Sequence, residues 1–118
     1  MPKAKIKTLL PTLRERKRYL AFEIISREKI SDVKAVTKEI FSSCKRFIGE
    51  LGLSKAGLIV LEDKYRNNKG MIRVSHKSVE NLKASLMLIN KVEDKEVIFR
   101  TLGVSGIMKK ANNRYIAS

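Results

Sequence analysis

The sequence predicts an α+β sandwich, in which helices cover one antiparallel sheet. The elements follow the order strand, helix, strand, strand, helix, strand, with one more helix at the end. Three observations predict it. Short runs of β-branched and aromatic residues suit strands. Two longer segments repeat their apolar residues at the spacing of an amphipathic helix. Asparagine and glycine lie between neighbouring runs, where tight turns need them.

The first strand is predicted at residues 17–26. Leu20, Phe22 and Ile24 fall on one face of it, because successive side chains of a strand point to opposite sides. The residues between them are also mostly apolar. We therefore expect a central strand that is covered on both faces, at least in part.

The first helix is predicted to begin after Ser31-Asp32, an N-cap signal, and to end where Gly49 and Gly52 interrupt its pattern. Its expected core positions, at helical spacing, are Val33, Val36, Ile40, Cys44, Phe47 and Leu51. Three lysines form a row beside that stripe: Lys34, Lys38 and Lys45. The row is either a solvated helix edge or a ridge that faces phosphates.

Residues 57–61 and 71–74 are predicted as two strands, joined by a turn at 65–70 in which Asn and Gly supply the positive φ angles of a tight hairpin. A second helix is predicted to be capped by Ser75 and to run to about Lys91. Its core stripe is Val79, Leu82, Leu86 and Ile89. Two apolar residues lie off that stripe, Met87 and Leu88, and either the arms of the protein cover them or a partner does.

A fourth strand is predicted at 96–102 and a basic helix at 107–115. Between them, Gly103 and Gly106 permit backbone angles that other residues resist, and Ser105 is a good helix N-cap. Unpaired N–H groups at such a helix start, followed by two lysines, favour a phosphate site. The alternative is an ordinary strand-to-helix corner with solvated lysines.

The order βαββαβ is the ferredoxin-like arrangement, which RNA-recognition domains share. We expect a basic N-terminal arm at 1–16 and a single domain at 17–118, with the C-terminal basic helix at about 106–115. RNA-recognition domains stack bases on aromatic residues of the third strand, and residues 69–76 lack them. The sheet face is therefore predicted not to stack bases, and to be covered by the extra helix and the arm.

The chain carries a net charge of +14 at pH 7, concentrated at its ends. Residues 1–18 contain seven Lys or Arg and one acidic residue, and residues 100–118 contain four and none. This excess favours a polyanionic partner, and nucleic acid ahead of an anionic membrane, because neither end has a strongly apolar helical face. No apolar run reaches the length of a membrane span, and the first residues lack a secretory signal. We therefore expect a cytoplasmic protein.

No catalytic residue or metal site is predicted. The single cysteine, Cys44, lies on the apolar face of the first helix and is expected to be a buried structural thiol. The single histidine, His76, has no identifiable carboxylate to orient it and is expected at the surface. Most acidic residues stand beside Lys or Arg, as on a solvated surface, and no cluster has the spacing of metal ligands.

Two stretches resemble the signature sequences of one family, the archaeal ribonuclease P protein component 2 family, which is related to a eukaryotic subunit of the same enzyme. They are residues 10–19 (LPTLRERKRY) and 99–106 (FRTLGVSG). The resemblance covers essentially the whole chain, including its length and element order. The family commonly has a second proline where this chain has Leu10, and that departure bears only on how the arm bends.

The resemblance implies a subunit of the ribonucleoprotein that removes the 5′ leader from precursor tRNA. In that family the chemistry belongs to the RNA subunit with bound Mg²⁺, so the protein itself is expected to bind no cofactor. The family also pairs with a second protein, component 3, in a heterotetramer around a central dimer of component 2. Met87 and Leu88 are candidates for such contacts.

The basic residues of both ends, with the turn between the last strand and helix, are expected to bind RNA. The predicted RNA-binding residues are Arg14, Arg16, Lys17, Arg18, Arg100, Gly103, Ser105, Gly106, Lys109, Lys110 and Arg114. They would neutralise phosphates and hold the active fold of the RNA at lower Mg²⁺. Two alternatives stay open: a protein-interaction scaffold with basic arms that only solubilise it, and a general RNA chaperone.

Overall fold

A computed structural model describes residues 16–117 of the chain. The elements in chain order are β1 (Lys17–Ile25), α2 (Val33–Ala56), β2 (Ile59–Val60), the short 3₁₀ turn η2 (Glu62–Lys64), β3 (Lys69–Ser75), a second such turn η3 (His76–Ser78), α3 (Val79–Met87), β4 (Lys91–Val92), β5 (Lys95–Glu96), β6 (Ile98–Ser105), α4 (Met108–Ala111) and the π-helical turn η4 (Asn112–Ile116). The order βαββαβ plus a C-terminal helix, predicted above, is confirmed.

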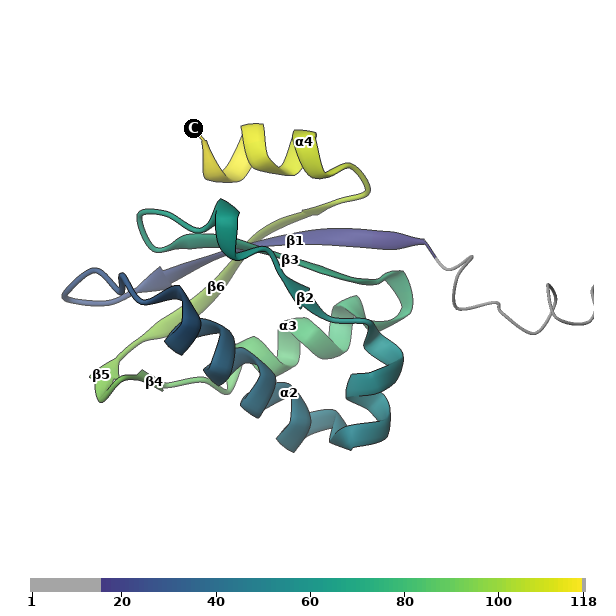
Figure 1. Cartoon of the computed structure of the whole chain (residues 1–118), viewed down its shortest axis with the longest axis horizontal. Helices are drawn as coiled ribbons and strands as arrows, with labels where there is room; N and C mark the ends of the chain where they lie inside the picture. The colour runs from purple at the N-terminus through teal and green to yellow at the C-terminus, as the bar shows by residue number, and fades with distance from the viewer. Residues whose placement is uncertain (1–15, 118) are drawn as a thin grey trace, which may run out of the picture.

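The four main strands form one antiparallel sheet in the order β2-β3-β1-β6, the strand order of a ferredoxin-like domain. Figure 1 shows α2 and α3 on one face of this sheet and α4 on the other. The predicted α+β sandwich is therefore confirmed. Residues 1–15, most of the predicted arm, lie outside the described part of the chain.

β1 is the central strand, and both of its faces are buried. Leu20, Phe22 and Ile24 point into the main core between the sheet and the helices, each at most 2% exposed. Ala21, on the opposite face, is fully buried in a second cluster beneath the C-terminal helix. The expectation of a strand covered on both sides is confirmed, because the C-terminal helix supplies the second cover.

α2 begins where the sequence predicted, since an Asp32 side-chain oxygen accepts hydrogen bonds from the backbone N–H groups of Lys34 (3.0 Å) and Ala35 (3.3 Å). The predicted end is wrong. Gly49, with φ of 76°, only kinks the helix, which continues to Ala56 and ends at a left-handed Gly57.

The kink also changes which side chains of α2 reach the core. Ile40 and Cys44 are buried as predicted, but Leu51, which follows the kink, is 71% exposed. Non-helical backbone at Gly49 breaks the regular rotation of 100° per residue, so the apolar stripe does not carry across it. Phe47, also predicted as core, is about half exposed.

The hairpin turn before β3 has the predicted chemistry, because Asn67 and Asn68 have φ of 52° and 61°. Asn68 does more than turn the chain. Its amide donates to the Ile24 carbonyl (3.1 Å) and accepts from the Ile30 N–H (2.8 Å), which ties the end of β1 to the hairpin. β2 is shorter than predicted because the chain leaves the sheet at η2 after two residues.

The segment after α3 differs from the prediction. The helix starts at Val79, after η3, and ends at Met87, and a small hairpin of β4 and β5 follows. Its turn residues Glu93 and Asp94 have φ of 52° and 66°. Two acidic residues are a weak signal for such a turn, which usually carries Gly or Asn, so the sequence pattern missed it.

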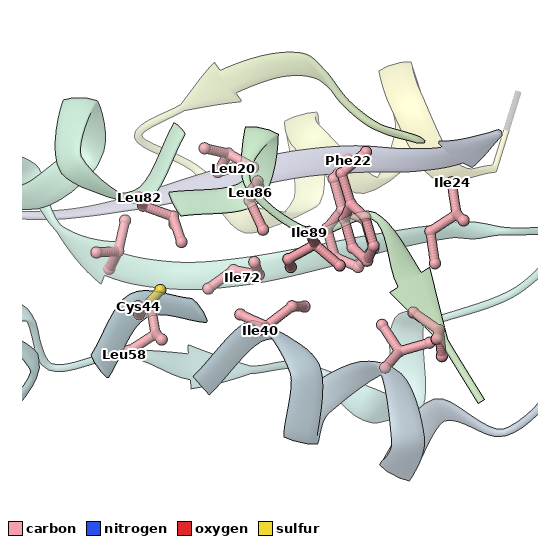
Figure 2. Packing of buried hydrophobic residues seen from close by; sticks show 14 of the residues in the cluster. Leu20, Phe22, Ile24, Ile40, Cys44, Leu58, Ile72, Leu82, Leu86 and Ile89 are labelled. Atoms are coloured by element: carbon pink, nitrogen blue, oxygen red, sulfur yellow. The ribbon is translucent and has the colours of Figure 1, made fainter. Parts of the chain in front are cut away.

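Figure 2 shows the main core, where Ile40 and Cys44 of α2 face Leu82 and Leu86 of α3 beneath the sheet. Cys44 is 1% exposed, so the predicted structural thiol is confirmed. Burial raises the pKa of this thiol, and a hydrogen bond with Ser85 partly offsets the shift. Within residues 16–117, no helix has the length and apolar character needed to cross a membrane.

Truncating a buried and an exposed side chain of α2 should have very different effects on the free energy of unfolding. Ile40→Ala removes a fully buried side chain and should lower the free energy of unfolding by about 2–5 kcal/mol. Leu51→Ala, in the same helix but exposed, should change it by no more than about 0.5 kcal/mol. Urea denaturation measures both. A large cost for Leu51→Ala would contradict the kinked arrangement.

Tyr65 should make stability fall at high pH. Its hydroxyl donates to the Ile30 carbonyl, and burial raises its pKa from 10.0 to about 12. The folded state thus favours the neutral phenol, so its contribution is complete below pH 10 and is lost as the pH rises through 12. Tyr65→Phe should therefore lose less stability between pH 10 and 12 than the unaltered protein, measured by urea denaturation. Equal losses would contradict this assignment.

Candidate nucleic-acid interface

The joint between β6 and α4 differs from the predicted strand-to-helix turn. β6 continues to Ser105, which pairs with Tyr19 of β1, and the helix begins only at Met108 with Ile107 as its N-cap residue. Ser105 is therefore not the N-cap. Its hydroxyl accepts a hydrogen bond from the Ile107 N–H (3.1 Å) and so shapes the turn that precedes the helix.

The sequence predicted that Gly103 and Gly106 permit unusual backbone angles, and the structure differs. Among the described glycines only Gly49 and Gly57 have positive φ, so neither Gly103 nor Gly106 is needed for an unusual backbone angle. At Gly103 the reason is space, because a Cβ there would lie 2.2 Å from Cζ and Oη of Tyr115. Gly106 is open, and its nearest neighbour would be Nη1 of Arg18 at 3.6 Å.

The helix itself is short. Four α-helical residues are followed by the five-residue π turn η4, which together cover most of the predicted span. A helix of this length has a small dipole, so the electrostatic argument for a phosphate site at its start is weak. Attraction for phosphate at this joint must come from side chains.

Basic residues from two segments, the start of β1 and the turn η3 after β3, lie at the same end of the sheet. Arg18 lies beside Gly106, and the His76 N–H donates to the Arg16 carbonyl (2.9 Å). We call this surface the basic end and define it by Arg16, Lys17, Arg18, His76 and Lys77. Within residues 16–117, none of the observed ion pairs involves these residues.

The first turn of α4 starts next to the basic end. Lys109 and Lys110 are exposed there, three and four residues after Gly106, and Arg114 follows at an exposed position in η4. Figure 1 shows the start of α4 and the start of β1 on the same side of the molecule. The fold thus brings the described basic residues at the start of β1 close to the start of the C-terminal helix.

Arg100 stands apart from this group. Its guanidinium donates to Oε1 of Glu23 on the neighbouring strand (2.7 Å). Five residues of strand separate it from Ser105, a distance of roughly 17 Å. Arg100 therefore already has a carboxylate partner, and it lies far from the basic end. Arg14, the remaining predicted contact, lies outside the described residues.

The row of lysines on α2 lies on the helical face of the molecule, away from α4 (Figure 1). Lys34, Lys38 and Lys45 are all exposed, and Lys45 forms an ion pair with Glu50 (3.1 Å). A pair this exposed contributes little to stability. The row has the features of a solvated helix edge, and no contact brings it to the basic end.

The sequence pattern of the Rpp14/Pop5 family matches residues 18–116. The chain belongs to the Rpp14/Pop5 family. Ribonuclease P protein component 2 of Methanosarcina mazei is 39% identical over 111 residues, which cover 94% of this chain and 93% of that protein. The protein of the same name from Pyrococcus abyssi is 37% identical over 115 residues, 96% and 95% of the two chains. The resemblance noted in the sequence is therefore confirmed.

The fold comparison agrees with the family. A chain in the cryo-EM structure of yeast ribonuclease MRP superimposes with a TM-score of 0.63 at 15% identity, covering 78% of this chain and 75% of that one. At such low identity the match concerns the fold alone. It supports the α+β architecture seen in Figure 1.

Two members of the basic end, His76 and Lys77, were not predicted to bind RNA. The antiparallel pairing of β1 and β3 in this Rpp14/Pop5 chain could have indicated their position. β3 runs antiparallel to β1, and Ser75 pairs with Lys17, so the residues after β3 must lie beside the start of β1. If the pairing is extended past the strand ends, His76 and Lys77 are expected next to Arg16.

The described part of this family member has hollows but no cluster of metal ligands. Within residues 16–117, no group of three or more His, Cys, Asp or Glu side chains is placed to hold a metal ion. An open hollow of about 770 Å³ lies at the far end of β1, where its lining includes Ile25, Ile98 and charged residues of both signs. It is remote from the basic end, so it adds nothing to that surface.

The second predicted surface, at the end of α3, is apolar and exposed. Met87 and Leu88 are 78% and 56% exposed, and no described residue covers them. Leu88 lines a shallow hollow with Arg46 and Phe47 of α2. The surface therefore extends onto α2, which the sequence pattern missed because it placed Phe47 in the core.

The ion pair between Glu23 and Arg100 should compete with polyanion binding. Glu23→Gln removes the carboxylate that holds Arg100 and should delay elution from a heparin column to higher salt. Glu39→Gln, in the helical layer, makes the same change in net charge and forms none of the observed ion pairs, so it serves as the control. Equal elution of the two variants would show that Arg100 is not available to polyanions.

Proposed function

We propose that this chain is a protein subunit of ribonuclease P, the ribonucleoprotein that removes the 5′ leader from precursor tRNA. The observation that carries the proposal is the match, over more than nine-tenths of both chains, to proteins named ribonuclease P protein component 2. A subunit role that binds RNA also agrees with the basic residues gathered at one end of the sheet.

In this proposal the basic end binds the phosphates of the catalytic RNA. The support is electrostatic, because the described cations there form no ion pairs and belong to a chain with a net charge of +14. Lys109, Lys110 and Arg114 extend the surface along the C-terminal helix. Mg²⁺ belongs to the RNA subunit, and neutralised phosphates let that RNA fold at a lower Mg²⁺ concentration.

The proposed protein partners are component 3 and a second copy of this chain. An exposed apolar surface supports them, since a chain that functions alone rarely leaves Met87, Leu88 and Phe47 exposed together. The same surface also supports the alternative function, a protein-interaction scaffold whose charge only solubilises it. The scaffold would bind a protein partner and retain no RNA.

Reconstituted cleavage tests the proposal. Ribonuclease P RNA and precursor tRNA are mixed with this chain, with component 3, with both or with neither, and 5′-leader release is followed across a Mg²⁺ titration. We expect the highest activity, and the lowest Mg²⁺ midpoint, when both proteins are present. If this chain binds component 3 and leaves cleavage unchanged, the scaffold is the better description. Equal stimulation of unrelated ribozymes would indicate a general RNA chaperone.

A matched pair of double variants locates the RNA surface. Lys109→Ala with Lys110→Ala should lower the slope of log affinity against log salt by up to about 1.8, since each phosphate contact contributes about 0.9. The melting temperature should stay nearly constant because both side chains are exposed. The control, Lys34→Ala with Lys38→Ala, removes the same charge from α2. An equal loss in the control would move the RNA surface to the lysine row.

A further inference from the structure

The signature stretch at the end of β6 contains a β-bulge. Gly103 pairs with Ala21, and Thr101 pairs with Phe22, so Leu102 has no partner of its own on β1. Such a bulge directs neighbouring side chains to the same face of the sheet. Leu102 accordingly packs into the second cluster, and the backbone of Gly103 faces the Tyr115 ring.

The contact between Gly103 and Tyr115 leaves no room for a side chain. A Cβ on Gly103 would lie 2.2 Å from Cζ and Oη and 2.7 Å from Cε1 of the ring, far inside van der Waals contact. The ring is partly buried, and Ala111 and Ile116 of the same helix are buried on the sheet, so a methyl group on Gly103 must displace the ring or the helix. Because φ of Gly103 is not positive, the ring alone accounts for the glycine.

The C-terminal helix is attached to the sheet from Ala111 onward. Ala111 and Ile116 are buried beside Ala21 and Met71, and Tyr115 is partly buried on Gly103. Residues 107–110, by contrast, are all exposed. A helix of nine residues is not stable in water by itself, so these sheet contacts decide where its first turn lies.

We propose that the contact of Tyr115 with Gly103 is a latch that positions Lys109 and Lys110 beside Arg18, so that both ends of the chain form one RNA-binding surface. Gly103 and Tyr115 are then positioning residues and do not touch the RNA. The structural part of this proposal does not depend on the proposed function, whereas its role in RNA binding does. The ring covers Gly103, so this glycine does not offer its backbone to a phosphate as the sequence had suggested.

A spin label tests the latch without RNA. A nitroxide on Lys110→Cys can be attached selectively because Cys44, the only native cysteine, is buried. In the otherwise unaltered protein it should broaden the NMR signals of the Arg18 and Gly106 amides. Gly103→Ala should remove the broadening at Arg18, whereas β3 amides keep their hydrogen-exchange protection. Unchanged broadening in Gly103→Ala would overturn the latch, whatever the RNA result.

Binding to ribonuclease P RNA tests its purpose. Gly103→Ala should weaken binding about tenfold and lower the salt slope by about one to two, the share of the two displaced lysines. Leu51→Ala, at an exposed position of α2 that belongs to neither proposed surface, is the control and should bind normally. If Gly103→Ala has a normal salt slope, the contact of Gly103 with Tyr115 does not contribute to RNA binding.

A double-mutant cycle separates the latch from other effects of an added methyl group. Tyr115→Ala removes the ring, and Gly103→Ala should then cause no further loss of RNA affinity. Additive losses would overturn the latch. If the unaltered protein shows no salt dependence at all, the proposed RNA binding fails, and the spin-label result still decides whether the latch exists.

Discussion

The structure depends on the burial of β1 between two layers. Its pairing with β3 on one side and β6 on the other places three strands in register. Leu20 and Phe22 fill the core beneath α2 and α3, and Ala21 between them lies under the C-terminal helix. A strand with polar residues on its second face could not seat that helix, because their burial without partners would be costly. The small side chain of Ala21 lets the helix approach closely.

This second cluster links the fold to the proposed function. In an RNA-recognition domain the open sheet face stacks bases, whereas here the C-terminal helix occupies that face. In the proposed function, nucleic acid therefore binds at one end of the sheet and not on its face. There the Arg18 guanidinium lies beside Gly106, just before the helix that covers the sheet. The same helix that closes the stacking surface supplies Lys109 and Lys110.

The apolar surface of Phe47, Met87 and Leu88 lies on the opposite layer of the molecule, formed by α2 and α3. In the proposed function, RNA and protein partners would therefore contact separate faces of the molecule, and one subunit could bind both at once.

The sequence by itself determined the order of elements, the covered central strand, the Asn67-Asn68 turn, the buried Cys44 and the basic character of both ends. These features follow from local chemistry and from the periodicity of apolar residues along the chain. The tertiary structure was needed to see that Gly49 kinks a helix instead of ending it, that Arg100 pairs with Glu23, and that Gly103 makes room for a ring. The last two depend on atoms brought together from distant positions, and the pattern within one segment carries no record of them.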